Sequence, residues 1–474
     1  MHTIIDLLFS QWRFGWFGVL TAISELVALL TIPSVLLRRQ GEPRAALSWL
    51  LAMFAIPAIG VFAWWAIGRT HIERKRKKIT ESKRESARRG TPHSEVGTPF
   101  DGLLPPRALG DSIFATSGND VEIIFEGKTA FSVLHQLIDG AKKAIHIQFY
   151  IFKNDATGRA VRDLLAKKAR EGVTVRVLVD AWGTPRFTGS FSNPLREAGA
   201  HVAAFLPSRF QPILAPRLNF ANHRKVVTVD EEVAFVGGMN VGDEYAHEWK
   251  DVMAKIRGPA VRALDHVFLE DWEFASNQTV THREFDRPPP QGAAVCAVLS
   301  SGPDRDGHYI HDAYFILFTH AEHRIWIVTP YFIPSDAIST ALRTAADHGV
   351  DVRIIIPSTS DVPIIKHAAR SYYLELLRGG VRIYEYQGPM LHAKAFVVDS
   401  DTCAVGSANV DTRSFRLSFE VSCVFKDERT CQRISEWFEG LVKDSHQVTI
   451  DECLNRSTGE KLLESVAHLW SPLL

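Results

Sequence analysis

The sequence predicts an α/β fold in which two similar lobes enclose one active site, preceded by an N-terminal transmembrane helical hairpin. Three observations support this prediction. The pattern H-x-K-x-x-x-x-D occurs twice, at residues 223–230 and 392–399. A strand, helix, strand pattern precedes each copy, which is typical of α/β folds. Two long apolar runs lie within the first 67 of the 474 residues. The expected domains are a membrane hairpin, a basic juxtamembrane segment with linker, and the two lobes, at 1–68, 69–120, 121–290 and 291–474.

The two apolar runs cover about 14–37 and 45–67, and a short turn with charged residues separates them. A helix rises about 1.5 Å per residue, so each run is long enough to cross a hydrocarbon core of roughly 30 Å. The first run is too long for a cleaved signal peptide and has no convincing small-residue cleavage site. We therefore expect a membrane hairpin with two spans.

A basic segment follows the second run. Residues 69–89 carry ten Lys or Arg and three Asp or Glu, a local charge near +7. The positive-inside rule then places everything after residue 69 in the cytoplasm, which makes this a multi-pass protein with cytoplasmic lobes. The same cluster could also hold anionic lipid head groups, although a topology signal alone explains it equally well.

The repeated segments predict matching secondary structure. We expect strands at 144–151 and 324–331, helices at 158–170 and 336–346, and further strands at 172–177 and 349–354. Alternation of this kind leads to a parallel or mixed sheet. An apolar, proline-broken stretch at 205–220 then precedes the first motif, and either a packed surface loop or a loop resting on the membrane would fit its composition.

The two motif copies agree well beyond their histidines. An asparagine follows each histidine by 17 positions, and an acidic residue follows each by 28. A single H-x-K-x-x-x-x-D would be an accident of a half-buried strand, but two copies with matching tails indicate a duplicated site. The candidate catalytic residues are those of the two motifs, His223, Lys225, Asp230, His392, Lys394 and Asp399.

A histidine paired with a lysine suits attack on phosphorus. Residues i and i+2 of a strand share a face, so each His–Lys pair should point into one space, whereas Asp230 and Asp399 should not. We give these two aspartates mainly a structural role at strand ends. One imidazole can attack phosphorus while the other moves protons, and the lysines stabilise charge on the phosphate oxygens. We expect His223 to be the nucleophile and His392 the acid and base, with no metal or other cofactor.

The residues after each motif are candidate supporting groups. A nucleophilic imidazole needs an acceptor at its other ring nitrogen, and Asp251 and Glu420 stand at matching positions for this role. Small residues and amides would let the backbone approach a phosphate and supply donors. These substrate-binding or supporting candidates are Gly238, Asn240, Ser407, Asn409, Asp251 and Glu420.

The paired motifs with their G-[GS]-x-N tails resemble the phospholipase D superfamily, and nearly the whole chain resembles its bacterial cardiolipin synthase branch. The stretches that carry the second resemblance are 301–304, 329–334, 409–415, 419–420 and 471–474. Two positions depart from the family pattern, Gly238 where Ser is frequent and Ser418 where Asn is usual.

The resemblance implies transfer of a phosphatidyl group from one phosphatidylglycerol to another, giving cardiolipin and glycerol, at the inner membrane of a bacterial cell. It implies phosphatidylglycerol and membrane lipids as partners. A phospholipase D-type hydrolase, a transferase for another head group, a membrane-tethered nuclease and a non-catalytic scaffold are the alternatives. The apolar stretch near the first motif, and the lack of a basic groove interleaved with aromatic residues, argue against nucleic acid as a partner.

Composition sets broad limits. The chain has 54 basic and 54 acidic residues, so its net charge gives no general attraction to nucleic acid. Its five cysteines form no C-x-x-C pair and are odd in number, which predicts buried thiols in a reducing compartment.

Overall fold

The computed structural model describes residues 15–39, 43–65, 100, 104, 113–185, 187, 189–206, 221–278, 280, 288–304 and 307–471. Two compact units are distinguished, one with the N-terminal helices and one with the α/β part that carries both motifs. The basic segment 69–89 and most of the stretch 205–220 lie outside the described residues.

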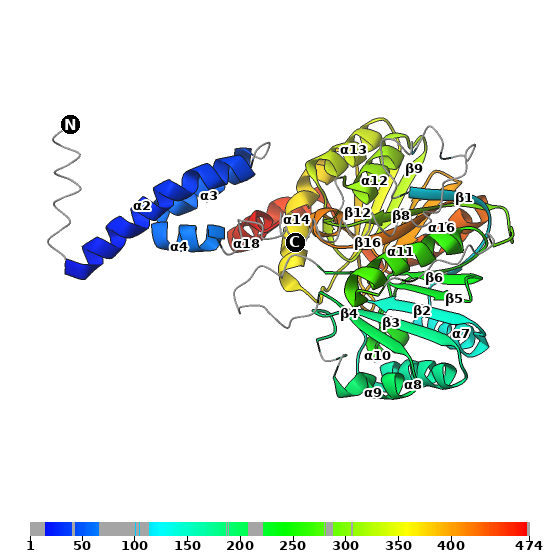
Figure 1. The fold of residues 1–474 in the computed structure, drawn as a ribbon. Helices are drawn as coiled ribbons and strands as arrows, with labels where there is room; N and C mark the ends of the chain where they lie inside the picture. The colour runs from blue at the N-terminus through cyan, green and yellow to red at the C-terminus, as the bar shows by residue number, and fades with distance from the viewer. Residues whose placement is uncertain are drawn as a thin grey trace. The chain divides into compact units, whose positions relative to one another are not determined.

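The described part of the N-terminal unit contains three helices, α2 (Gly15–Arg38), α3 (Pro43–Ala55) and α4 (Pro57–Ala63) (Figure 1). Among the described residues, one helix is long and apolar enough to cross a membrane, Gly18–Arg38 with 21 residues. Most of its large side chains are exposed, including Leu30 at 72%. This agrees with the first predicted span.

The second predicted span, 45–67, does not form one helix. The chain breaks at Ile56, whose φ of −143° and ψ of 80° are not helical. Pro57 is the cause, since the proline ring disfavours helical geometry in the preceding residue. Helix α4 then turns back so closely that a Cβ at Gly60 would lie 2.7 Å from the Ala52 carbonyl oxygen, and the Trp64 indole donates to Ser34 at 3.2 Å.

Among the described residues, the first half of the α/β part carries seven strands and five α-helices. Their order is β1 (Ile113–Ile124), α7 (Gly127–Gly140), β2 (Ala144–Phe149), α8 (Ala156–Arg170), β3 (Thr174–Asp180), α9 (Asn193–Glu197), β4 (His201–Phe205), β5 (Val226–Val229), β6 (Val233–Gly237), α10 (Asp243–His247), β7 (Met253–Arg257) and α11 (Ala260–Ser276).

The second half repeats this order and adds C-terminal elements. Its elements are β8 (Ala294–Ser301), α12 (Tyr309–Thr319), β9 (Arg324–Val328), β10 (Phe332–Ile333), α13 (Asp336–Asp347), β11 (Asp351–Pro357), α14 (Pro363–Arg378), β12 (Arg382–Tyr386), β13 (Ala395–Val398), β14 (Thr402–Gly406), β15 (Val410–Asp411), α15 (Thr412–Arg416), β16 (Glu420–Lys426), α16 (Glu428–Lys443), β17 (Ser445–Gln447), α17 (Ile450–Asn455) and α18 (Thr458–Leu469).

Both halves join in one mixed sheet of 15 strands, ordered β17-β12-β11-β9-β13-β14-β16-β8-β1-β7-β6-β5-β2-β3-β4. The central strands β1 and β8 pair antiparallel. Reading outward from them, each half presents its strands in the same order, with β17 as an addition at one edge. The strands β2, β3, β9 and β11 and the helices α8 and α13 lie where the sequence predicts them.

Helices cover both faces of the sheet. One apolar core holds α11 and α16 against the central strands. Two further cores lie on the opposite face, under α7 to α9 in the first half and under α12 to α14 in the second. Figure 1 shows α12 and α13 at one end of this part and α8 and α9 at the other. Burial on both faces explains why β5 (VVTV) and β13 (AFVV) are almost wholly apolar.

One sequence prediction is corrected here and another is confirmed. Residues 113–120, expected in a linker, belong to β1, which pairs with β7 and with β8. The apolar-polar alternation there was too weak to identify a strand. All five cysteines are free and buried, as predicted.

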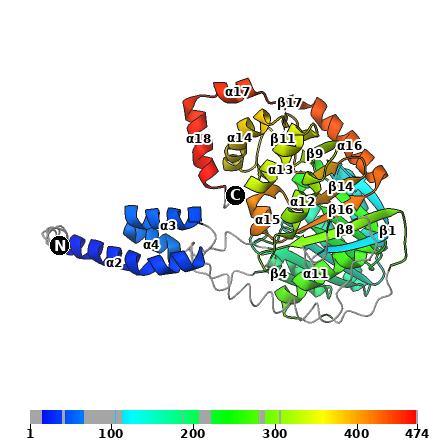
Figure 2. The same ribbon diagram turned by 90° about the horizontal axis from the view of Figure 1, so that it is seen from above.

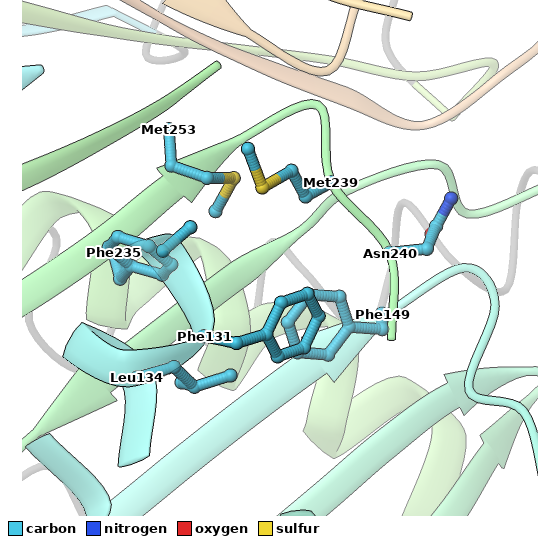
Figure 3. Close-up of a pocket in the computed structure, with 8 residues that line it drawn as sticks. Phe131, Leu134, Phe149, Phe235, Met239, Asn240 and Met253 are labelled. Carbon is cyan, nitrogen blue, oxygen red and sulfur yellow. The ribbon is translucent and has the colours of Figure 1, made fainter. Parts of the chain in front are cut away.

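A small apolar pocket lies in the first half, beneath the turn that follows β6. Figure 3 shows Phe131 and Leu134 of α7 facing Phe235 and Met253 across it. Its remaining lining includes Asn240, whose amide is engaged with Ile151 and Tyr245. The pocket is therefore a packing feature of the core that supports this turn.

Candidate active site

The two motif histidines are fixed by equivalent backbone contacts between the halves. The His223 N–H donates to the Phe419 carbonyl at 2.9 Å, and the His392 N–H donates to the Lys250 carbonyl at 2.7 Å. Short parallel bridges at Asn222 with Phe419 and at Lys250 with Leu391 complete these contacts. The histidines were expected inside β5 and β13, but each lies in the extended segment just before its strand. Pairing with the other half replaces pairing within the sheet there.

The predicted acidic partners pair crosswise. Asp251 follows His223 in sequence, yet its Oδ2 lies 2.7 Å from Nδ1 of His392. Glu420 follows His392, yet its Oε1 lies 3.3 Å from Nδ1 of His223. Each half therefore supplies the acid that faces the histidine of the other half.

The two His–acid pairs differ in geometry. Asp251 and His392 form a hydrogen bond between buried groups. Nδ1 of His223 and Oε1 of Glu420 face each other without a hydrogen bond of normal geometry, and neither buried atom has another partner in the described structure. The His392 side is the more tightly held of the two.

Both lysines lie beside their histidines and are buried. Nζ of Lys394 is 2.9 Å from Nδ1 and 3.0 Å from Nε2 of His392. Nζ of Lys225 donates to the His223 carbonyl at 2.5 Å and lies 5.5 Å from the centre of the Tyr150 ring. Each pair thus shares one space, as the i and i+2 spacing predicts.

Burial sets the protonation of the site. It lowers the pKa of Lys225 to about 8 and that of Lys394 to about 7, and it raises the pKa of Glu420 to about 7. Burial, helped by the charge of Lys225, holds the pKa of His223 well below its usual range. The pKa of His392 is also lowered by burial and by Lys394, while Asp251 opposes this effect. These shifts keep His223 neutral, while the Asp251 carboxylate favours the imidazolium form of His392.

Gly238 and Ser407 occupy equivalent positions and explain one departure from the family pattern. A Cβ at Gly238 would lie 2.2 Å from Oδ1 of Asp251, so the carboxylate leaves room for glycine alone. In the other half, the Ser407 hydroxyl donates to the longer Glu420 side chain. A short acid with glycine on one side thus corresponds to a long acid with serine on the other.

The amides expected to face a phosphate are mostly engaged elsewhere. The Gly238 N–H donates to the Val252 carbonyl at 3.0 Å and the Ser407 N–H to the Val421 carbonyl at 2.8 Å. Asn240 accepts from the Ile151 N–H at 3.0 Å. Asn409 differs, because its Oδ1 is buried and has no partner in the described structure.

Asp230 and Asp399 lie away from the histidines, at the ends of β5 and β13. Their φ values are 54° and 53°. The Asp230 carboxylate accepts from the backbone N–H groups of residues 142–144, and that of Asp399 accepts from residues 322–324. These contacts agree with the structural role at strand ends that the sequence predicts for both aspartates. They give no support to a direct catalytic role.

A buried arginine that the motif analysis passed over links the two halves. Arg224 is fully buried and forms an ion pair with Asp271 of α11 at 2.6 Å. Its guanidinium also donates to the carbonyls of Glu420 at 3.1 Å and Ser301 at 3.0 Å. The equivalent residue of the second motif is Ala393. A charged residue between His and Lys of a buried strand was the signal that could have revealed this contact.

Aromatic rings line the histidines. The Tyr150 ring lies 4.2 Å from the His223 ring, and the Tyr245 and Trp249 rings lie 5.6 Å and 5.3 Å from that of His392. Sequence patterns gave these residues no role beyond packing. Within the described part of the chain, no group of three or more His, Cys, Asp or Glu side chains is placed to hold a metal ion.

The geometry can support displacement at phosphorus. It brings together the neutral imidazole of His223, the imidazole of His392 whose protonated form Asp251 favours, two lysines that can hold phosphate oxygens as ammonium groups, and two acids that orient the imidazoles. Each half has its own histidine, lysine and acid, but each acid faces the histidine of the other half. The site is therefore complete only when both halves are present.

Comparison with known proteins agrees with this arrangement. The family model described as "Cardiolipin synthase, PLD-like domain" matches residues 134–272 and again 314–442. Among similar proteins, the major cardiolipin synthase of Bacillus subtilis is 35% identical, over 96% of this chain and 99% of the relative. A cardiolipin synthase of Alkalihalophilus pseudofirmus is 33% identical, over 98% of this chain and 95% of the relative.

A solved structure shares the fold at low identity. The phosphatidylserine synthase of Haemophilus influenzae superimposes with a TM-score of 0.59 at 15% identity, and covers 75% of this chain and 95% of its own. The repeated family match and the full-length relatives together show that this chain belongs to the cardiolipin synthase family of phospholipase D-like proteins.

Proposed function

We propose that the protein is a cardiolipin synthase. It would transfer a phosphatidyl group from one phosphatidylglycerol to a hydroxyl group of another and release glycerol. The crossed pairing of each histidine with the acid of the other half carries this proposal, because it assembles one site from both motif copies. Relatives named cardiolipin synthase over nearly the full length of the chain support the choice of substrate.

In the first step, His223 would attack phosphorus. Its lowered pKa keeps the imidazole unprotonated, so a ring nitrogen is free to form the P–N bond. The bond from phosphorus to the glycerol head group breaks, and His392 donates the proton that the leaving oxygen needs. Asp251, 2.7 Å from His392, would stabilise the imidazolium before this transfer.

In the second step, His392 would accept the proton of the incoming hydroxyl group. The oxygen of that alcohol attacks phosphorus, the P–N bond breaks, and His223 returns to its starting state. Lys225 and Lys394 would hold the non-bridging phosphate oxygens throughout, because their ammonium groups lie beside the two imidazoles. Asn409 would add its free amide oxygen for a substrate hydroxyl group.

The remaining parts fit an enzyme that works on membrane lipid. We propose that the two halves, 121–290 and 291–474, act as lobes around the site, and that residues 1–68 anchor the protein in a bacterial inner membrane. Helix Gly18–Arg38 is long enough for one crossing. The basic segment 69–89 would keep the catalytic part on the cytoplasmic side.

Lipid mass spectrometry tests this function. The full-length protein in vesicles is incubated with phosphatidylglycerol, with and without a chelator, beside the variants His223→Ala and His392→Ala. His348→Ala, which changes an exposed histidine at the end of α13, serves as the matched control.

We expect equimolar cardiolipin and glycerol from the wild type and the control, and neither from the two motif variants. Phosphatidic acid as the main product would identify a hydrolase that uses water as acceptor. Product formation by the motif variants would contradict the proposed site.

A further inference from the structure

The exposed apolar side chains of the α/β part are concentrated at its C-terminal end. Among the described residues from 113 onward, nine large hydrophobic side chains are exposed, and eight of them belong to α14, α17 and α18 or directly follow α18. Scattered single residues of this kind are normal on a protein surface, but a contiguous group marks an interaction site.

Helix α18 and the residue that directly follows it carry five of these eight side chains. The α18 strip consists of five side chains, Leu462 (65% exposed), Leu463 (48%), Val466 (46%), Leu469 (76%) and Trp470 (52%). Spacings of one, three and four residues place them on one side of a helix. No charged side chain belongs to the strip, and its single polar group is the indole N–H of Trp470.

The opposite side of α18 packs against the α/β part. This packing fixes the orientation of the helix, so the strip faces outward. Ala467 is 1% exposed and packs with Ile365 and Ala368 of α14. Glu464 is buried and forms an ion pair with Arg456 at 3.0 Å. A capping box fixes the start of the helix. Figure 2 shows α18 alongside α14 at the surface.

The strip backs onto elements next to the site. Ala467 belongs to the same apolar cluster as Ile333 of β10 and Tyr331. Strand β10 pairs with β15, which begins at Val410 directly after Asn409. A surface that engages α18 would therefore lie one packed layer away from the segment that carries the second motif's asparagine.

We propose that the α18 strip rests in the surface of a lipid bilayer and holds the active site at the membrane. This inference rests on the proposed action on a membrane phospholipid. A bilayer fits better than a protein partner for two reasons. The strip offers hydrocarbon and one indole, with no pattern of polar groups for a protein to match. The chain also carries its own membrane-length helix, so its α/β part works beside a bilayer.

The charge of α18 sharpens the proposal. Its polar side combines Lys461 with the acidic Glu460, so the helix is not basic. Binding then depends on insertion of apolar side chains rather than on anionic head groups. We expect contact with phosphatidylcholine and phosphatidylglycerol vesicles alike, with little dependence on salt.

Depth-dependent fluorescence quenching tests the strip in the full-length protein. A cysteine at Val466 is labelled with the environment-sensitive dye NBD, and Lys461→Cys on the polar side of α18 is the matched control. The five native cysteines are buried and should stay unlabelled under native conditions. The proteins are placed in vesicles that contain lipid with a nitroxide on the acyl chain, and iodide is the aqueous quencher.

We expect the nitroxide lipid to quench the label at 466 at least about threefold more than the label at 461, and iodide to show the reverse order. Equal quenching of both labels by iodide would overturn the proposal. Protection of position 466 from both quenchers would also overturn it, because a second copy or another segment of the chain would then cover the strip.

Activity provides a second readout. In the double variant Leu462→Gln/Leu469→Gln we expect KM for phosphatidylglycerol in vesicles to rise about five- to tenfold, with kcat for detergent-dispersed lipid unchanged. An unchanged KM in vesicles would contradict the proposal. Quenching is measured in the His392→Ala background as well, so insertion of the strip and formation of cardiolipin can fail independently.

Discussion

The two halves of the active site share a backbone frame but differ in the side chains that complete it. His223 faces Glu420 at 3.3 Å without a normal hydrogen bond, whereas His392 is bonded to Asp251 at 2.7 Å. Gly238 stands where the other half has Ser407. Duplication supplies two imidazoles in similar positions, and in the proposed mechanism these differences suit His223 to nucleophilic attack and His392 to proton transfer.

The largest expected effect comes from removing each imidazole in turn. We expect His223→Ala to lose at least about 10⁴-fold in kcat and to form no phosphoenzyme, because no group remains to make the P–N bond. His392→Ala should also be slow with phosphatidylglycerol. With a phosphatidyl ester whose leaving group needs no proton, such as p-nitrophenol, it should accumulate the phosphatidyl group on His223.

Mass spectrometry of peptides from acid-free digests locates the phosphate. Phosphate on His392 in the His223→Ala variant would reverse the assigned roles. The wild type, quenched within one turnover, is the positive control.

The arginine present in only one motif gives the next effect, on stability. Arg224→Met leaves Asp271 buried without its ion pair, and breaking a buried pair in this way costs about 3–5 kcal/mol in the free energy of unfolding. Arg224→Met/Asp271→Leu should recover much of the loss, since it removes both charges. Lys255→Met breaks the exposed pair with Glu122 and should cost no more than about 1 kcal/mol.

Denaturant unfolding of the detergent-solubilised protein, followed by tryptophan fluorescence, measures these differences. Equal losses for Arg224→Met and Lys255→Met would mean that the buried ion pair contributes no more to stability than the exposed pair.

Sequence patterns were sufficient to predict the features that occur in both halves of the chain. The motif spacing identified both His–Lys pairs, and the equal offsets of Asp251 and Glu420 identified the acids. The strands β2, β3, β9 and β11 followed from local apolar runs. These strands can be recognised as short apolar runs because each of them is buried on both faces of the sheet.

The crossed pairing could not be read from spacing. An offset along the chain measures sequence distance, whereas His392 meets Asp251 through the bridge between Lys250 and Leu391. Arg224 was missed for the same reason, since its partners come from α11, β8 and β16. The break at Ile56 was foreseeable, because Pro57 stands in the middle of the second apolar run.

A third prediction compares the small residues. Gly238→Ala would place a Cβ 2.2 Å from Oδ1 of Asp251, so the carboxylate that holds His392 has to shift. We expect a loss of about 10- to 100-fold in kcat/KM, as is usual when the group that orients a reactive histidine moves. Ser407→Ala removes one hydrogen bond to Glu420 without any new contact, and should cost only a few-fold. Steady-state kinetics with both variants checks the order, and a greater loss in Ser407→Ala would contradict it.

The smallest expected effect is a shift in the pH dependence of activity when the negative charge of Glu420 is removed. The lysines bind phosphate only as ammonium groups, and their pKa values are about 8 for Lys225 and about 7 for Lys394. Activity should therefore fall as pH rises through this range. Glu420 is the strongest influence that raises the pKa of Lys225, so its neutral replacement Glu420→Gln lowers that pKa further and moves the alkaline limb of kcat/KM to lower pH.

Glu122→Gln, at an exposed position, should leave the alkaline limb in place. Profiles of kcat/KM between pH 5.5 and 9.5 measure the shift, and an upward shift in Glu420→Gln would mean that another group governs the limb. A bound phosphate stabilises the ammonium form, so the limb of kcat should lie above that of kcat/KM in every variant that keeps both lysines.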